Sequence, residues 1–237
     1  MKALTNALFP LLCILSACSG GDMPAPIVHF TFDNHQAGDI QDYSGHGNHG
    51  TRRAGGVAPG VLGVAAVTNG EAEGMTRIPM SPSLSAIGDQ ISLSVWAWRE
   101  NSRNTALAAY EYPTLFFGFH GRGFKWALHY ASGRGATCYA DSQYVAEERR
   151  WYHMVATFNG WVARLYVDGK EICTDWTRGG HLALTDAPLT LGGYLATDGS
   201  VVDTLDGRMD DLRIYDVALT DAQVYSLYLA GVADPVQ

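Results

Sequence analysis

Alternation of apolar and polar residues is the most regular pattern in the chain. In residues 91–98, ISLSVWAW, Ile91, Leu93 and Val95 take one set of alternate positions, while serines and tryptophans take the other. A period of two predicts a strand with one buried face. The pattern recurs through Phe124, Trp126, Leu128 and Tyr130, and through Leu212 and Ile214. Many such strands in one domain predict an all-β sandwich.

Residues 151–176, WYHMVATFNGWVARLYVDGKEICTDW, predict a three-strand antiparallel meander. Asn159-Gly160 and Asp168-Gly169 suit the positive φ angles of two-residue type I′ turns. In the register that these turns set, Phe158 faces Trp161, Met154 faces Leu165, and Leu165 faces Ile172. The predicted core face consists of Met154, Ala156, Phe158, Trp161, Ala163, Leu165, Val167 and Ile172.

The other face of the meander is mixed, charged and aromatic. Such a composition is typical of an open or ligand-facing sheet surface. Its members are His153, Val155, Arg164, Tyr166, Glu171, Cys173 and Asp175.

One helix is predicted near the end of the chain. Thr220 and Gln223 form the T-x-x-Q pattern of a capping box, and Leu219 with Val224 suits a hydrophobic staple. Gly231 is the expected end of the helix.

The N-terminal segment predicts export. Lys2 precedes a short apolar run that is too short to span a bilayer. Leu15-Ser16-Ala17-Cys18 resembles a bacterial lipobox, which implies cleavage before Cys18 and a lipid on its thiol. The alternative is a general secretory signal with an incidental cysteine. Ser19 after the cysteine resembles the outer-membrane sorting variant, and the lipid would anchor the protein to the membrane.

The domain organisation follows from this segment. We expect a signal peptide over 1–17, a lipidated tether over 18–26, one domain over 27–231 and a tail over 232–237. Cys138 and Cys173 are then the pair that remains in an oxidising compartment, and a disulfide is favoured over two free thiols.

Charge and motifs exclude several functions. The chain has 237 residues, with 16 Lys+Arg against 24 Asp+Glu and a net charge of −8. The sequence contains no run of basic residues, so a nucleic-acid partner is not predicted. GHGNHG, residues 45–50, matches the dinucleotide-binding fingerprint G-x-G-x-x-G, but TRRAGGVAPG follows it without a helical period. The nucleotide-binding reading therefore fails, and His46 with His49 is a weak zinc pattern because no third ligand can be named.

Oxygen-bearing side chains gather in the same region. Asp33, Asn34, Asp39, Asp42, Ser44 and Asn48 lie among glycines. Such loops can hold a hard cation such as calcium. They also form ordinary Asx turns, and the segment alone favours that second reading.

A family resemblance covers most of the predicted domain. FTFDNHQAGDIQDYSGHGNHG, ISLSVWAW, WYHMVATFNGWVARLYVDGKEI and LTLGGYLATDGSVVDTLDGRMDDLRIYDVALTDAQVYSLY follow in the order seen in laminin-G-like, concanavalin A-like domains of bacterial exported proteins. The resemblance implies a two-sheet antiparallel jelly-roll sandwich with one short C-terminal helix.

The resemblance also implies a structural calcium ion. Carried onto this sequence, its ligands are Asp33, the loop from Gly45 to Asn48, and Asp210 or Asp211. Asp210 ranks above Asp211 because it shares the parity of Leu212 and Ile214 and would be buried, where a carboxylate needs compensation. With this pairing, calcium is favoured over a metal-free loop.

Catalysis is not predicted. A retaining glycosidase needs two carboxylates roughly 5 Å apart, and neither E-x-D-x-E nor E-x-D-x-x-E occurs. Glu71 and Glu73 are the nearest pair. His153, Arg164 and Tyr166 share a face, but a polar sheet surface is preferred over a lyase site for them.

A non-catalytic binding lipoprotein is the leading prediction, with carbohydrate as ligand. Aromatic rings and planar polar groups bind sugars. The candidates are Trp98, Arg164, Tyr166 and Trp176, while Trp96 and Trp151 are assigned to structure. The alternatives are a protein-binding adhesion or structural component of a surface assembly and, third, a divergent polysaccharide-active hydrolase or lyase.

Overall fold

The computed structural model describes residues 21–34, 38–111, 114–130, 132–140, 143–177, 179–182 and 184–233. The predicted signal peptide, Cys13, Cys18 and the last four residues lie outside these ranges.

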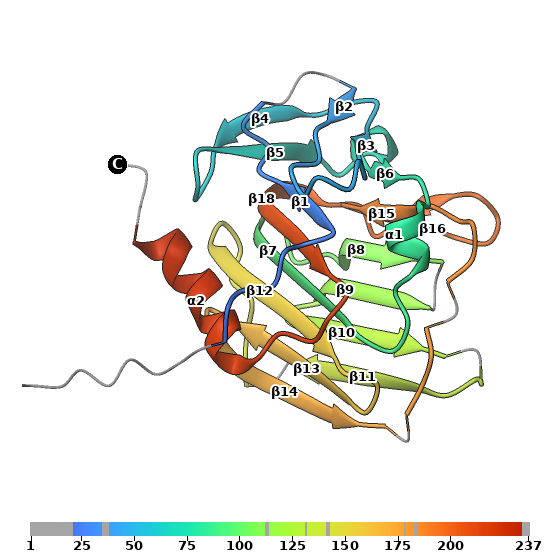
Figure 1. The fold of residues 1–237 in the computed structure, drawn as a ribbon. Helices are drawn as coiled ribbons and strands as arrows, with labels where there is room; N and C mark the ends of the chain where they lie inside the picture. The colour runs from blue at the N-terminus through green and yellow to red at the C-terminus, as the bar shows by residue number, and fades with distance from the viewer. Residues whose placement is uncertain are drawn as a thin grey trace, which may run out of the picture.

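Two antiparallel eight-stranded sheets face one another (Figure 1). Sheet I has the order β14-β13-β12-β7-β18-β5-β4, and β1 also pairs with β18. Its strands are β1 (Val28–Phe30), β4 (Gly56–Pro59), β5 (Val64–Asn69), β7 (Ile91–Arg99), β12 (Trp151–Phe158), β13 (Val162–Val167), β14 (Lys170–Trp176) and β18 (Asp206–Tyr215).

Sheet II has the order β11-β10-β9-β8-β15-β6-β3-β2. Its strands are β2 (Asp39–Ile40), β3 (Gly50–Thr51), β6 (Thr76–Ile78), β8 (Thr105–Tyr110), β9 (Leu115–His120), β10 (Gly123–His129), β11 (Gly135–Ala140) and β15 (Leu189–Leu191). The remaining elements are the hairpin β16 (Tyr194–Leu195) and β17 (Val201–Val202), the 3-10 turn η1 (Ala72–Gly74), α1 (Pro82–Ser85) and α2 (Asp221–Val232). The predicted all-β jelly-roll sandwich is confirmed.

The core lies between the sheets, and the alternating segments supply it. Ile91, Leu93 and Val95 of β7 are buried in the same core cluster as Phe124, Trp126 and Leu128 of β10. Trp126 is fully buried, and its indole Nε1 donates to the Thr157 carbonyl at 3.3 Å. Period two thus identified the inward faces of these strands correctly.

The first turn of the meander differs from its prediction. Phe158 pairs with Ala163, and Asn159 N–H donates to the Val162 carbonyl, so Gly160 and Trp161 are the central turn residues. Asn159 Oδ1 accepts from the backbone N–H groups of Trp161 and Val162, which favours this placement. The register moves by two residues, which leaves each strand face unchanged. Trp161 itself, predicted in the core, is 62% exposed.

A β-bulge changes the direction of Cys173. The Asp168-Gly169 turn forms as predicted, with φ of 51° and 73°. The register then shifts between Tyr166 and Leu165, so Leu165 pairs with Cys173 and not with Ile172. Cys173 therefore packs against the core, not on the face of Arg164. It forms a disulfide with Cys138 of sheet II, with 5.6 Å between the Cα atoms.

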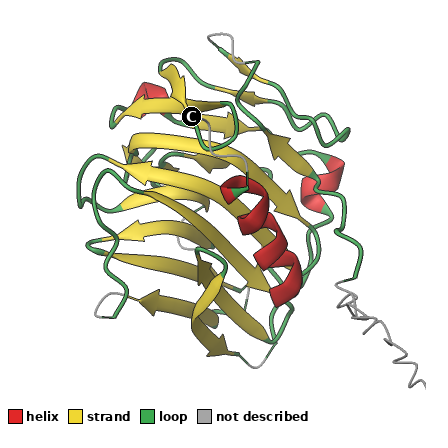
Figure 2. Ribbon diagram, turned by 90° about the vertical axis from the view of Figure 1, so that its left-hand side faces the viewer, coloured by secondary structure: helices red, strands yellow, loops and turns green. Residues whose placement is uncertain are grey.

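Helix α2 lies across the outer face of sheet I (Figure 2). The predicted capping box of Thr220 and Gln223 is present. Val224 and Leu227 pack with Val155 and Tyr166 of the sheet. Gly231 is inside the helix and not at its end, because α2 continues to Val232. A Cβ at Gly231 would lie 2.5 Å from the Trp96 ring, so the glycine permits close helix–sheet contact.

Candidate functional site

The predicted ligand-binding face of sheet I is covered by α2. Tyr166 is 2% exposed, and its phenol donates to Asp221 of the helix at 2.7 Å. His153 is also buried and lies 3.0 Å from Ser94 Oγ. Neither side chain can reach a ligand in solution. The predicted assignment of Tyr166 to ligand binding is wrong because the predicted helix packs on its face.

The other three candidates do not meet. Trp98 holds the guanidinium of Arg208 3.6 Å from its ring centroid, and Arg164 pairs with Glu171 at 3.2 Å. Trp176 is 73% exposed. Trp98 pairs with the first residue of β12, whereas Trp176 lies beyond the last, which separates them by about 25 Å at 3.3 Å per residue. These residues therefore form no common site.

Two predicted calcium ligands hold one turn of the backbone. Asp33 Oδ1 accepts from Val64 N–H at 2.8 Å. Asp210 Oδ2 accepts from the N–H groups of Val61 and Leu62 at 2.7 and 2.8 Å. Asp210 is fully buried, and burial raises the pKa of its carboxyl to about 7. Both carboxylates thus organise the β4–β5 connection through amide groups.

The other predicted ligands belong to different networks. Asn48 N–H donates to Asp42, which also accepts from His29 N–H and from Ser44, and these bonds lower the pKa of Asp42 against the opposing effect of burial. Gly45 adopts a φ of 88° in the same loop. Asp211 Oδ1 lies 2.8 Å from His29 Nε2 and 3.0 Å from Arg213, in a second bulge.

These networks bear on whether a calcium ion fits. Within the described ranges, no group of three or more His, Cys, Asp or Glu side chains is placed to hold a metal ion. Asp33, Asn48, Asp210 and Asp211 each bond to protein groups, whereas Asp210 Oδ1 has no hydrogen-bond partner among the described residues. Calcium binding stays a prediction, which thermal unfolding with calcium and with a chelator would test.

A pocket of about 300 Å³ opens on the outer face of sheet II. Thr51 of β3 pairs with Arg77 of β6, which places both side chains on the side away from the core. Arg53 follows β3, and its N–H donates to the Glu73 carbonyl of η1 at 3.0 Å. The full lining is Thr51, Arg52, Arg53, Ala72, Glu73, Met75, Arg77 and Val201.

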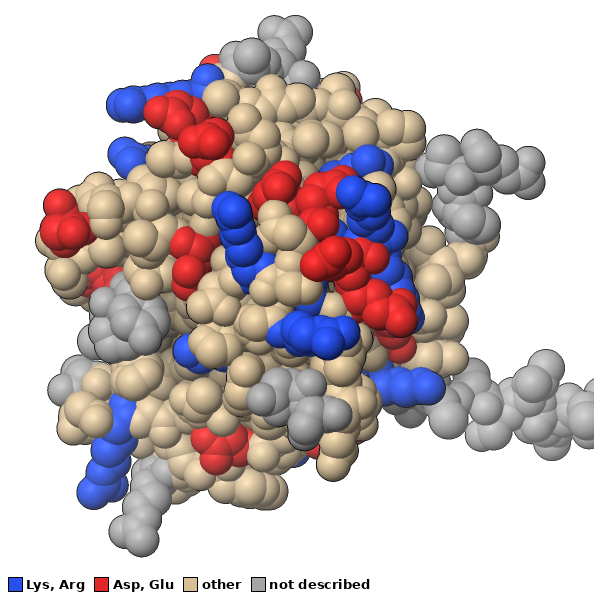
Figure 3. Space-filling view, turned by 180° about the vertical axis from the view of Figure 1, so that it is seen from behind, with Lys and Arg blue, Asp and Glu red and all other residues tan. Residues whose placement is uncertain are grey.

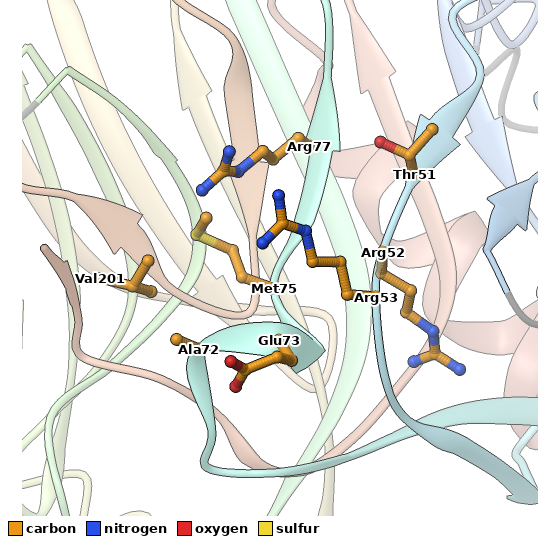
Figure 4. A pocket seen from close by; sticks show the side chains of 8 residues that line it. All are labelled: Thr51, Arg52, Arg53, Ala72, Glu73, Met75, Arg77 and Val201. Carbon is orange, nitrogen blue, oxygen red and sulfur yellow. The ribbon is translucent and has the colours of Figure 1, made fainter. Parts of the chain in front are cut away.

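Two arginines converge in this pocket. Figure 4 shows the guanidinium groups of Arg53 and Arg77 extending into the same pocket, with the Glu73 carboxylate below them. Both arginines are exposed, and neither makes an ion pair or side-chain hydrogen bond with a described residue. Each therefore retains its five N–H donors for a ligand.

Arg52 has a structural role in the same wall. Its side chain runs the other way in Figure 4 and donates to the carbonyls of Gly56 at 2.7 Å and Val67 at 3.2 Å. Burial lowers its pKa. Arg52 thus fixes the backbone that carries Arg53.

The hairpin β16–β17 forms the opposite border of the pocket. Tyr194 packs on an apolar cluster of sheet II that includes Phe116 and Ala127. Val201 of the same hairpin lines the pocket. On the face seen in Figure 3, acidic and basic side chains are interspersed among uncharged ones. A pair of converging arginines is thus a local feature of an acidic protein.

Pattern analysis missed this pocket. Arg52 and Arg53 were part of the TRRAGGVAPG run that excluded a nucleotide-binding helix, and Arg77 lay far along the chain. The adjacent pair Arg52-Arg53 was the signal that the sequence offered. Arg77 comes beside this pair only through the pairing of β3 with β6. Glu71 precedes the 3-10 turn η1 and Glu73 lies within it, so this pair of carboxylates is not on a strand.

Residues 70–225 match the family model described as the concanavalin A-like lectin/glucanases superfamily. The chain belongs to this superfamily. No curated protein sequence matches the chain. No described helix has the length and apolar composition to cross a membrane.

Solved structures with a similar fold include one domain of an arabinanase and the binding domains of two toxins. Domain 4 of the extracellular arabinanase AbnA from Geobacillus stearothermophilus, in complex with arabinotriose, shares 22% identity at a TM-score of 0.62, over 87% of this chain and 100% of that one. The binding domain of Paraclostridial Mosquitocidal Protein 1 shares 14% identity at 0.69, and that of Botulinum Neurotoxin DC, in complex with SialylT, shares 13% at 0.65. Both alignments cover 87% of this chain, which spans about half of each toxin domain (52%).

Proposed function

We propose that this chain is a non-catalytic carbohydrate-binding module whose site is the Arg53–Arg77 pocket. The observation that carries the proposal is the pocket itself, a hollow of about 300 Å³ lined by a carboxylate, a hydroxyl and two arginines that make no ion pair with a described residue. Small-ligand sites are concave and combine apolar walls with a few convergent polar groups. Met75, Ala72 and Val201 supply the apolar wall.

The relatives support a glycan as the ligand. The arabinanase domain was solved with arabinotriose, and a toxin binding domain with SialylT. These ligands belong to those proteins, and their low sequence identity to this chain leaves its own glycan to be found by experiment. The lack of a catalytic role is likewise part of this proposal, and it is supported by the two toxin neighbours, which are described as binding domains.

A glycan array probed with the full chain tests this function. A bulky side chain at the mouth of the pocket, in Thr51→Trp, should abolish array binding. Thr137→Trp is the matched control, because Thr137 is an exposed residue of the same sheet on the distant strand β11. If the folded wild-type protein binds no glycan, the proposal fails, and a protein ligand becomes the alternative to pursue.

We also infer that the module is held at the bacterial outer membrane by a lipid on Cys18. The support is the Leu15-Ser16-Ala17-Cys18 pattern, followed by the short tether. Cells that express the full chain should yield it in the outer-membrane fraction and should label it with a radioactive fatty acid. Cys18→Ala should lose both the label and the membrane association, and an unlabelled wild type would overturn the anchor.

A further inference from the structure

The charges around the pocket are matched to one acidic group. Arg53 and Arg77 bring two positive charges, and Glu73 brings one negative charge. The third arginine of the lining, Arg52, is turned to the carbonyls of Gly56 and Val67. One net positive charge therefore faces a ligand. An arginine guanidinium is planar and presents paired N–H donors that fit the two oxygens of a carboxylate.

The Glu73 carboxylate favours one class of acidic ligand over another. A phosphate or sulfate group fills a small volume with charge and would meet the Glu73 carboxylate directly in a shared pocket. A sugar acid separates its carboxylate from its hydroxyl groups by a ring. The carboxylate can then lie between the arginines while hydroxyl groups donate to the Glu73 carboxylate, which can accept hydrogen bonds but not donate them.

We propose that the pocket binds a sugar residue that carries one carboxylate, with Arg53 and Arg77 on the carboxylate and Glu73 on ring hydroxyls. This proposal rests on the carbohydrate-binding function and specifies its ligand class. A volume of about 300 Å³ suits one or two sugar residues and not a long chain. The attraction between the glycan carboxylate and the two arginines is electrostatic. Added salt should therefore weaken binding.

Binding of uronic-acid oligosaccharides to the full chain tests the ligand class. The probe is trigalacturonic acid, with its methyl ester as the uncharged analogue, measured by titration calorimetry at two salt concentrations. We expect esterification to weaken binding at least about tenfold, because each charge-assisted hydrogen bond contributes more than a neutral one. Sialylated and other acidic oligosaccharides are tested in parallel, so that the result does not depend on one sugar acid.

Two variants assign the effect to this pocket. Arg53→Gln and Arg77→Gln should each weaken binding of the acidic glycan about tenfold or more and reduce its salt dependence. Arg103→Gln, at another exposed arginine, should leave binding unchanged. The inference is overturned if the neutral analogues bind as tightly as the acids, or if both pocket variants bind like the wild type. If no glycan of either kind binds, the carbohydrate-binding function fails as well.

A separate observation concerns the outer face of α2. From Ala222 to Ala233 the helix and its C-cap contain no charged residue. Val224, Leu227 and Gly231 are buried on the inner face, yet Tyr225, Leu229 and Val232 remain 50%, 42% and 42% exposed. Spacings of four and three residues place these three on one face. A helix that is apolar on both sides is normally covered on both sides.

The N-terminal tether contacts the start of this helix. Gln223 Nε2 in the first turn of α2 donates to the Asp22 carbonyl at 3.0 Å. Cys18 precedes Asp22 by four residues, which span at most about 14 Å. A lipid on Cys18 would therefore hold the start of α2 close to the membrane surface.

We infer that Tyr225, Leu229 and Val232 of α2 rest on the lipid surface in the anchored protein. This inference depends on the proposed lipid anchor. Three side chains would bind a membrane only weakly, but the anchor keeps them at it, and tyrosine favours the membrane interface. Because α2 covers sheet I and the Arg53–Arg77 pocket opens on sheet II, the pocket would face away from the membrane (Figure 1).

Quenching by brominated lipids tests this orientation. The full lipidated chain is reconstituted in phosphatidylcholine vesicles with brominated acyl chains. Leu229→Trp should show more quenching than the wild type, whereas Thr137→Trp on sheet II should not. A vesicle-bound protein in which both variants are quenched alike overturns the orientation. If the wild type does not associate with vesicles, the anchor itself is wrong.

Discussion

The phenol of Tyr166 donates a 2.7 Å hydrogen bond to the carboxylate of Asp221 and so joins β13 to the first turn of α2. Burial, together with the neighbouring Asp221, raises the pKa of Tyr166, so the phenol keeps its proton and remains a donor. A carboxylate at this position also interacts favourably with the N-terminal end of the helix dipole. The bond thus helps to hold α2 over the outer face of sheet I, which the sequence pattern had predicted to be exposed.

Removal of this bond should destabilise the fold without affecting the ligand. We expect Tyr166→Phe to lower the free energy of unfolding by about 1–3 kcal/mol, because Asp221 loses a partner in a charge-assisted hydrogen bond. Urea unfolding followed by circular dichroism measures the change. Tyr225→Phe, at a half-exposed tyrosine of the same helix, should change stability little. If Tyr166→Phe lost glycan binding while its stability stayed unchanged, Tyr166 would be a ligand-binding residue after all.

Gly231 should resist a substitution that normally stabilises helices. Alanine in a helix interior is favoured over glycine by about 1 kcal/mol. At Gly231, however, the new methyl group would lie 2.5 Å from the Trp96 ring. Overpacking of this kind costs about 1–3 kcal/mol, so Gly231→Ala should lower the thermal midpoint. Ala230→Gly, at an exposed neighbour, should lower it through helix propensity alone, and a rise in Gly231→Ala would contradict the close packing.

Local sequence signals predicted the strands and the helix well. They did not predict which strands pair or which residues a bulge turns to the other face. Alternation in β7 and the capping box at Thr220 are short-range features, and both predictions are confirmed. The bulge beside Leu165 leaves no such signal, and one inserted residue is enough to turn Cys173 inward. The pocket depends on the pairing of β3 with β6, a contact between distant segments that periodicity cannot specify. The candidate site was therefore missed although the fold was predicted.

The Cys138–Cys173 disulfide should stabilise the sandwich because it joins β11 of sheet II to β14 of sheet I. For cysteines separated by 35 positions in the sequence, the loop-closure model gives a contribution of about 3–4 kcal/mol. The double variant Cys138→Ala/Cys173→Ala should unfold at correspondingly lower urea concentration. Reduction of the wild type should reproduce that loss, and dithiothreitol should not affect the variant further. Equal stability of variant and wild type would contradict the contribution.

His153 should make the protein sensitive to mild acid. Burial lowers the pKa of its imidazole to about 3, against an ordinary value of 6.5. Between these values the unfolded chain binds a proton that the folded protein does not, so stability falls as the pH drops below 6.5. At pH 5 the loss from this residue is about 2 kcal/mol.

A comparison of His153→Gln with the wild type isolates this effect from the titration of carboxylates. The difference in free energy of unfolding between the two proteins should move by about 2 kcal/mol in favour of the variant from pH 7 to pH 5. Glutamine cannot take up a proton there but can still bond to Ser94. His129→Gln, at an exposed histidine of β10, should give a curve parallel to the wild type. Parallel curves for His153→Gln would mean that α2 opens enough for water to reach the imidazole.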